Sequence, residues 1–211
     1  MLTRTGPNPW RVAIILEELG LPHETEFMDN QKVKAKPFTD INPNGRVPAI
    51  EDPNTGTTLW ESGAIVQYLV ETYDKENKIS FPTSSPDRFQ TMQWLFFQAT
   101  GQGPYFGQAA WFHKFHPEQL PSAKERYKNE VDRVTMVLNN ALEGKKYLVG
   151  NKCTFADLSF IMWYSMLGFI FGDESPDLHK KYPNFGFWLD SMQARASVKK
   201  VFEDKAKAAS H

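Results

Sequence analysis

The sequence predicts an α/β domain followed by a domain built of helices. Over residues 1–76, short apolar strands alternate with helical patterns, as in mixed α/β domains. From residue 87 onward, apolar residues recur at helical spacing. The segment between them, residues 77–86, is polar and contains two prolines, which is typical of a linker. We therefore expect domains at 1–76 and 87–211.

Composition excludes several classes of protein. With 211 residues, 41% of them hydrophobic and 14% aromatic, the chain has the balance of a globular protein, not of a disordered one. Its formal net charge of −1 is too balanced for a dedicated nucleic-acid binder. No uninterrupted apolar run approaches the roughly 20 residues that cross a bilayer, and the first ten residues lack a signal sequence.

Cysteine and histidine content excludes metal and disulfide scaffolds. Cys153 is the single cysteine, so we expect neither disulfides nor a cysteine-rich zinc site, and we interpret it as a packing residue. His113 and His116 lack a third ligand at suitable spacing, so no metal is predicted. These features predict a soluble cytoplasmic protein that binds neither membrane nor nucleic acid.

The first predicted helix follows a short initial strand. Asn8 is expected as its N-cap, with Pro9 at the first helical position. Apolar residues at 12, 15, 16 and 19 form one face, while Glu17 and Glu18 lie opposite, and Gly20 ends the helix.

The rest of the first domain contains strands, a turn and a second long helix. Strands are predicted at 23–28 and 47–50. The sequence from 52 to 56 favours a hairpin turn into a strand at 57–60, and a helix begins near residue 61.

The second domain shows strong helical periodicity. Apolar residues step by four and three along 125–142, which predicts one amphipathic helix. Thr154 and Asp157 precede a run that is apolar nearly all round, so they predict a capping box on a central helix. A last helix is expected after Pro183.

Pro48 follows Val47 at the end of an apolar strand. On statistics alone an ordinary trans proline is favoured, since only about 5–6% of such bonds are cis. A cis bond would instead present the Val47 backbone amide and carbonyl to an extended ligand. The hairpin that follows is of a length that brings Glu61 and Ser62 back to this point.

Glu61 and Ser62 open a helix and have two interpretations. They are helix-capping residues, or Ser62 and the helix N-terminus accept a ligand carboxylate while Glu61 pairs with an ammonium. A ligand with both groups on one carbon is an α-amino acid, and a γ-glutamyl group fits.

Asn8 is similarly ambiguous. It is either a helix cap or a donor to a thiolate held at the helix N-terminus. Lowering a thiol pKa by about 2 requires about 2.7 kcal/mol. A charge-assisted hydrogen bond supplies about 1.5–3 kcal/mol and a helix end about 0.3–1 kcal/mol. Together they suffice without a general base.

Four motifs occur in order along the chain: Gly6–Val12, Asn42–Ile50, Glu61–Ile65 and Leu148–Asp157. Their sequences and the gaps between them resemble the cytosolic glutathione transferase superfamily over essentially the whole chain. The form of the first motif resembles the fungal branch related to the yeast nitrogen-catabolite regulator and prion protein.

The resemblance implies a thioredoxin-like glutathione-binding domain and a helical domain with a hydrophobic substrate site. Val47 and cis-Pro48 would bind the cysteinyl backbone, while Glu61 and Ser62 would hold the γ-glutamyl end. Asn8 matches the position that contacts the thiol sulfur.

Other assignments also follow from this resemblance. Lys34, or else Lys36, would meet the glycyl carboxylate, and Thr5 is a candidate second hydroxyl donor. The first strand is short for this family, so we expect a truncated strand and a weakened sheet around the site. In the aromatic stretch of the second domain, candidates for the hydrophobic substrate site are Tyr105, Phe106, Trp111 and Trp163.

The expected function is conjugation of glutathione to apolar electrophiles by a cytoplasmic fungal homodimer in detoxification, with glutathione as co-substrate and no metal. One alternative is glutathione-dependent reduction of disulfides or peroxides, in which a second glutathione resolves the disulfide. Another is a non-catalytic glutathione-binding regulator. The yeast relative that acts in this way carries an Asn/Gln-rich extension that this sequence lacks.

Overall fold

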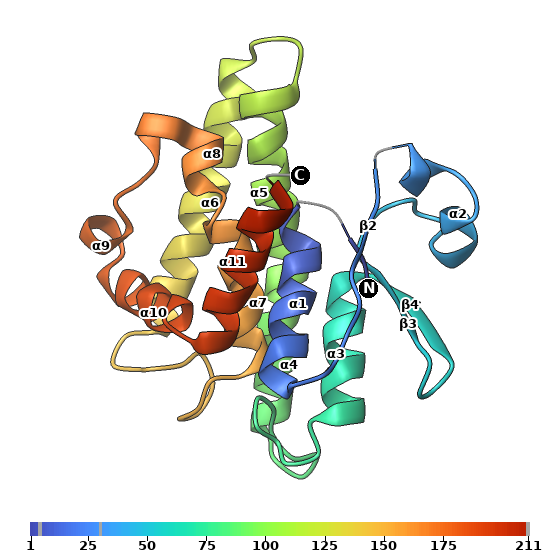
Figure 1. The fold of residues 1–211 in the computed structure, drawn as a ribbon. Coiled ribbons are helices and arrows are strands. Elements are labelled where there is room, and N and C mark those ends of the chain that lie inside the picture. Colours follow the sequence, from blue (N-terminus) through green and yellow to red (C-terminus); the bar gives the residue numbers. More distant parts are fainter. Residues whose placement is uncertain (4–5, 30, 210–211) are drawn as a thin grey trace. The chain divides into compact units, whose positions relative to one another are not determined.

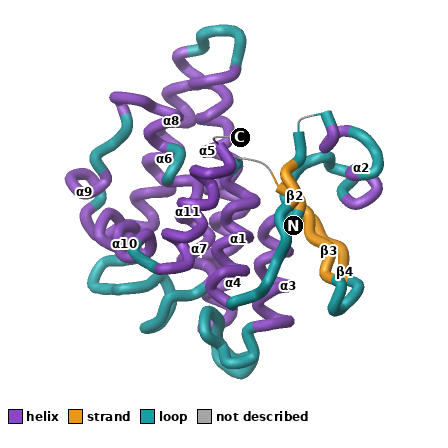
Figure 2. Tube along the Cα trace, in the orientation of Figure 1, coloured by secondary structure: helices purple, strands orange, loops and turns teal. Residues whose placement is uncertain are grey.

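The computed structural model describes residues 1–3, 6–29 and 31–209. The chain forms two compact units (Figures 1 and 2). One contains Met1–Ser80 together with the C-terminal segment from Arg195 onward, and the other contains Phe81–Ala194. Each unit has its own core and is described by itself.

The first unit is built on a four-stranded mixed sheet with the order β2-β1-β3-β4. β1 pairs with β2 in parallel and with β3 antiparallel, and β3 and β4 form a hairpin. In Figure 1, α1 and α3 lie on one side of this sheet and α2 on the other. The strands are β1 (Leu2–Thr3), β2 (Glu26–Phe27), β3 (Ala49–Asp52) and β4 (Thr57–Trp60).

One strand is shorter than the sequence predicts, and another begins two residues later than expected. β2 covers two residues of the expected 23–28, because it is an edge strand whose single neighbour, β1, also offers two residues. β3 begins at Ala49, after Pro48, because a proline nitrogen cannot donate a ladder hydrogen bond.

The first helix of this unit begins two residues before the position that the capping rules predict. α1 begins at Pro7 with Gly6 as an extended N-cap, so the prediction that Asn8 is the cap is wrong, and Asn8 lies in the first turn. Pro7 suits the first helical position as well as Pro9 does. The helical segments are α1 (Pro7–Leu19), η1 (Lys32–Lys34), α2 (Phe38–Ile41), α3 (Ser62–Tyr73) and α11 (Ala196–Ala209).

The last helix belongs to the first unit. α11 packs along α1, and Figure 1 shows the two side by side. The sequence placed residues 87–211 in one helical domain, since local patterns identify the helix but not its packing partner. Arg195, at the start of this segment, is held by Glu18 of α1.

The second unit is helical, as predicted. The buried helix α7 runs through its core, and the Thr154–Asp157 capping box at its start is confirmed. The segments are α4 (Asp87–Phe97), η2 (Gln98–Gln102), α5 (Gly103–Ala110), η3 (Trp111–Phe115), α6 (Pro121–Ala141), α7 (Phe155–Tyr164), α8 (Leu167–Phe171), η4 (Gly172–Glu174), α9 (Leu178–Lys181) and α10 (Pro183–Gln193).

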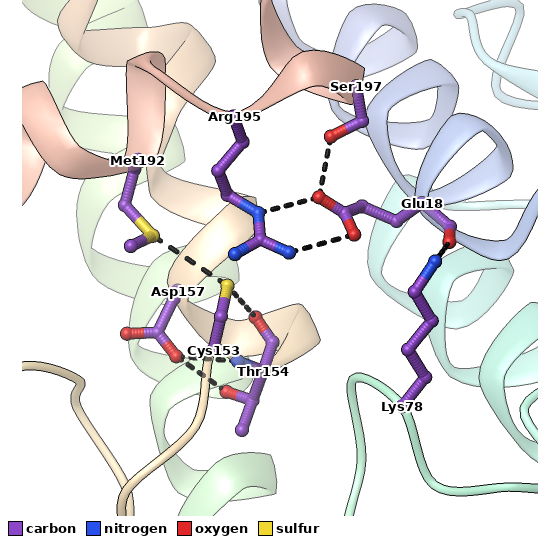
Figure 3. A network of polar contacts seen from close by, with 8 residues as sticks. All are labelled: Glu18, Lys78, Cys153, Thr154, Asp157, Met192, Arg195 and Ser197. Atoms are coloured by element: carbon purple, nitrogen blue, oxygen red, sulfur yellow. Dashed lines mark hydrogen bonds and ion pairs between the residues drawn. The ribbon is translucent and has the colours of Figure 1, made fainter.

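One segment of this core is long and apolar enough in composition to cross a membrane. Phe155–Glu174 has a mean hydropathy of 1.4, yet 67% of it is buried within the structure, which is the behaviour of a core segment. Next to it, Cys153 is buried and its sulfur lies 3.7 Å from the Met192 sulfur (Figure 3), consistent with a packing residue.

Candidate functional site

Among the described residues, no side chain caps the N-terminus of α1. Gly6 contributes no capping side chain, and the first turn contains no acidic residue, so the positive end of the helix is not neutralised locally. Asn8 lies half-buried in this turn. Because the cap is a different residue, the capping interpretation of Asn8 no longer applies.

A rigid turn leads into the cis-proline. Asn42 is buried, accepts a hydrogen bond from the Asn44 amide at 2.9 Å and donates through Nδ2 to the Arg46 carbonyl. The bond between Val47 and Pro48 is cis, as the ligand-binding interpretation required.

Val47 is anchored by its side chain and leaves its backbone available. The side chain packs against a small core of Val33, Phe38 and Ala49. Among the described residues, none forms a hydrogen bond with the Val47 amide or carbonyl. These two groups are the ones an extended peptide would pair with in strand fashion.

The β3–β4 hairpin brings the residue after β4 back beside the residue before β3. Ala49 pairs with Trp60 in the β3–β4 ladder, so Pro48 and Glu61 follow at the same end of it. Glu61 adopts a positive φ of 70°, which non-glycine residues rarely adopt. Such strain persists where surrounding structure imposes it, and it clusters at ligand sites.

The N-terminus of α3 has free donors. Its first intrahelical bond runs from the Ile65 amide to the Glu61 carbonyl at 2.9 Å. The amides of Ser62, Gly63 and Ala64 have no acceptor in the described part of the chain. Together with the helix dipole, such amides are donors that suit a carboxylate.

Arg11 joins the two helix N-termini. It lies one turn after Asn8 in α1, is buried, and donates from Nη2 to the Ser62 hydroxyl of α3. Burial lowers the pKa of Arg11 to about 10, against the opposing charge of Glu61. The sequence analysis gave this residue no role of its own, although it lies within the first motif of the family resemblance, Gly6–Val12.

Lys34 and Lys36 occupy different environments. Lys36 forms an exposed ion pair with Asp40, with 3.1 Å between Nζ and Oδ1. Lys34 instead lies over the turn at Gly45, where a Cβ would come within 3.4 Å of its Nζ. Of the two, Lys34 therefore lies against the turn that leads to Val47. Thr5, the other predicted hydroxyl donor, lies outside the described residues.

The four aromatic candidates of the second unit divide by burial. Phe106 is fully buried and packs edge-on against Tyr164, with ring centroids 5.1 Å apart, so it is a core residue. Tyr105 is half-buried beneath the Arg133 guanidinium. Trp111 is exposed, and Trp163 is half-buried.

Trp163 lies along a small-residue face of α5. A Cβ on Gly107 would contact Cη2 of its ring at 3.5 Å, and a Cβ on Gly103 would lie 3.7 Å from its Nε1. The two glycines, four residues apart, let the indole approach the helix backbone.

The fold defines a protein of two units, of which the first is thioredoxin-like and the second helical. Residues 5–72 match the family "Glutathione S-transferase, N-terminal domain", and residues 104–205 match "Glutathione S-transferase, C-terminal domain". The chain belongs to the glutathione S-transferase family. The predicted family and fold class are thereby confirmed.

Relatives by sequence are fungal. The glutathione S-transferase-like protein gedE of Aspergillus terreus is 53% identical over 204 residues, which cover 93% of this chain and 90% of that protein. Protein URE2 of Debaryomyces hansenii is 37% identical over 232 residues, covering 92% of this chain and 74% of that protein. The resemblance to the Ure2-related fungal branch is therefore also confirmed.

Two similar solved structures come from Phanerochaete chrysosporium. Glutathione transferase URE2P6, in complex with oxidized glutathione, has a TM-score of 0.93 and 45% identity, covering 98% of this chain and 96% of that chain. Ure2p5, cocrystallized with 1-(S-glutathionyl)-2,4-dinitrobenzene, has a TM-score of 0.89 and 40% identity, covering 98% and 93%.

Proposed function

We propose that this protein is a glutathione transferase that conjugates glutathione to apolar electrophiles. The observation that carries the proposal is the placement of Asn8 in the first turn of α1, beside an N-terminus that has no acidic residue. A thiolate at this point receives both the helix dipole and a side-chain donor.

The other binding roles follow from the same unit. The Val47 amide and carbonyl pair with the cysteinyl backbone next to cis-Pro48. The amides at the start of α3, with Ser62, take the γ-glutamyl carboxylate, and Glu61 takes its ammonium. Lys34 takes the glycyl carboxylate, since Lys36 is paired with Asp40.

The mechanism is ionisation and positioning, without a covalent enzyme intermediate. The bound thiolate attacks the electrophilic carbon, and the leaving group departs with the bonding electron pair. We propose that Tyr105, Trp111 and Trp163 contact the apolar substrate, while Phe106 supports them from the core. We further propose a cytoplasmic homodimer that acts in detoxification.

The test is a titration of bound glutathione, following the ultraviolet absorbance of its thiolate against pH. We expect the thiol pKa to fall by about 2 on binding, a change of about 2.7 kcal/mol. Asn8→Ala should reverse most of this effect, whereas Asn54→Ala, in the remote β3–β4 turn, should leave it unchanged. An unaltered thiol pKa in the wild-type complex would indicate a non-catalytic glutathione-binding regulator instead.

A second candidate function is glutathione-dependent disulfide reduction. It is favoured by the oxidized glutathione bound to URE2P6. The bound thiolate would attack a glutathionyl mixed disulfide, forming oxidized glutathione and releasing the other thiolate. Turnover of mixed disulfides without turnover of 1-chloro-2,4-dinitrobenzene would select this function, and the reverse pattern would select conjugation.

A further inference from the structure

Three aromatic side chains form an exposed surface on the second unit. Trp111 and Phe115 lie on η3, and Phe169 lies on α8, which packs against η3. The ring centroids of Trp111 and Phe115 are 6.4 Å apart, and those of Phe115 and Phe169 are 6.1 Å apart. The three residues are 46%, 59% and 48% exposed, respectively. Contiguous apolar surface of this kind is typical of a place where a ligand or partner binds.

This aromatic surface is held from behind by stacked rings. The Phe112 ring stacks on Tyr127 at 5.4 Å and on His116 at 5.0 Å. Trp111 packs edge-on against the His116 ring at 6.1 Å. The His116 ring is itself oriented by a hydrogen bond that its Nδ1 accepts from the Glu118 amide at 3.0 Å. The exposed rings are therefore in place before a ligand binds.

One cation lies on the same surface. Lys114 is exposed, and its Nζ is 5.7 Å from the centroid of the Phe169 ring. Among the described residues, no carboxylate lies within ion-pair distance of Lys114. Glu174, a neighbouring carboxylate, pairs with Lys128 instead, with 2.8 Å between the charged atoms. The surface thus combines aromatic faces with an ammonium group that lacks a carboxylate partner.

These groups favour one class of ligand. A planar aromatic ring stacks well on the exposed faces of Trp111, Phe115 and Phe169. An acidic group on that ring can pair with the Lys114 ammonium through a charge-assisted hydrogen bond. A neutral aromatic ligand gains only the first of these interactions, so the surface distinguishes the two by charge.

We propose that the electrophiles this protein prefers are aromatic and anionic, and that Lys114 pairs with their acidic group. Phe115 and Phe169 then extend the aromatic surface beyond Trp111. This inference rests on the proposed conjugation of glutathione and names its substrate class. In each turnover a carbon–sulfur bond forms at the ring carbon, and the leaving group departs with the electrons of the bond that breaks. Lys114 takes no part in that step and acts on which electrophile is bound.

The test compares two aryl chlorides that share the same reacting ring. One is 4-chloro-3,5-dinitrobenzoate, and the other is its neutral N-methylamide. The kcat/KM of each, divided by its uncatalysed rate constant, gives the preference for the anion. Lys114→Gln should lower this preference about threefold to fivefold, the effect of one solvent-exposed ion pair. Lys114→Glu should lower it further, because a like charge then faces the carboxylate.

Lys146→Gln is the matched control. Lys146 also lies over an aromatic ring of the second unit, that of Tyr147, at the same distance of 5.7 Å. Its removal should leave the preference as in wild type. If Lys114→Gln keeps the wild-type preference while both substrates are turned over, the proposal is overturned and conjugation stands. If wild type turns over neither aryl chloride, the proposed function itself fails, and this inference fails with it.

Two further measurements separate charge from ring contact. Phe169→Ala should raise the KM for both aryl chlorides several-fold, because both lose a ring contact, and unchanged KM values would remove Phe169 from the substrate surface. In wild type, added salt should reduce the preference for the anion, since an exposed ion pair is screened. A preference that does not change with salt would contradict the pairing with Lys114.

Discussion

Arg195 holds Glu18 with two hydrogen bonds, from Nε to Oε1 at 2.6 Å and from Nη2 to Oε2 at 2.9 Å. Ser197 donates to the same carboxylate at 2.5 Å, and Lys78 donates to the Glu18 carbonyl (Figure 3). Glu18 is 5% exposed, so this is a nearly buried carboxylate whose partners come from the start of α11 and the segment after α3. The cluster fastens the C-terminal helix to α1.

Arg195→Met should therefore destabilise the protein. The substitution leaves the Glu18 carboxylate buried with fewer hydrogen-bond donors. We expect the free energy of unfolding to fall by about 3 kcal/mol, which is the low end of the range for a buried ion pair because Arg195 is partly exposed. The matched control is Lys200→Met, which breaks the solvent-accessible ion pairs of Lys200 with Glu17 and Asp204. That variant should lose less than about 1 kcal/mol. Urea unfolding measures the free energy of unfolding of both variants. Equal decreases would contradict the conclusion that the buried Glu18 carboxylate depends on Arg195.

The same carboxylate should make stability depend on pH. Burial is the largest single influence and would raise the pKa of Glu18, but hydrogen bonds from Arg195 and Ser197, together with nearby cationic charge, lower it overall. A carboxyl whose folded pKa is lowered stabilises the protein above its unfolded pKa, and that contribution is lost as pH falls through the folded value. The difference in free energy of unfolding between wild type and Glu18→Gln should therefore shrink as the pH falls below about 4.3, the pKa of a free glutamate. Urea unfolding at pH 7 and at steps below pH 4.3 tests this, and a constant difference would refute it.

Local sequence predicted the parts of the site that depend on neighbouring residues. The hairpin and the helix start near Ser62 follow from turn residues and apolar runs close together in the sequence. The cis bond between Val47 and Pro48 was expected from the family resemblance, whereas statistics alone favoured a trans bond. The capping box at Thr154 is equally local. The N-cap of α1 was predicted two positions too late, because Pro7 and Pro9 both satisfy the rule for a helix start.

The parts that sequence did not predict depend on distant partners. Glu18 has the pattern of an exposed helix face, yet it is buried by a residue 177 positions away. Arg11 is likewise buried against a residue 51 positions away. Periodicity identifies which side of a helix is apolar, but it does not reveal which buried polar group is met by a later segment.

The turn at Gly45 should control the position of Lys34. Gly45 has a φ of +61°, and a Cβ there would lie 2.8 Å from the Val33 carbonyl oxygen and 3.2 Å from Lys34 Cδ. Gly45→Ala should cost about 1–3 kcal/mol through backbone strain and should displace Lys34, weakening glutathione binding. Gly56→Ala, in the β3–β4 turn, also has a positive φ but no atom near its Cβ, so it serves as a control for strain alone. Unchanged glutathione affinity in folded Gly45→Ala would separate Lys34 from the ligand site.

Lys34→Met and Lys36→Met should differ in their effect on glutathione affinity. Lys36 is paired with Asp40, so its removal should change affinity less than twofold, whereas Lys34→Met should weaken binding several-fold. Both side chains are exposed, and neither variant should alter stability by more than about 0.5 kcal/mol. Calorimetric titration with glutathione makes the comparison, and a larger loss in Lys36→Met would reverse the assignment.

Substitution of Trp111 should change the KM for the electrophile but not the affinity for glutathione. It is 46% exposed in the second unit, as is expected of an aromatic side chain that awaits an apolar ligand. Trp111→Ala should raise the KM for an apolar electrophile several-fold and leave the affinity for glutathione unchanged. Phe187, on α10 and 68% exposed, is the control because its removal deletes a similar exposed ring elsewhere on the same unit. Steady-state kinetics with 1-chloro-2,4-dinitrobenzene distinguishes the two, and equal KM values for Trp111→Ala and wild type would place the apolar site away from η3.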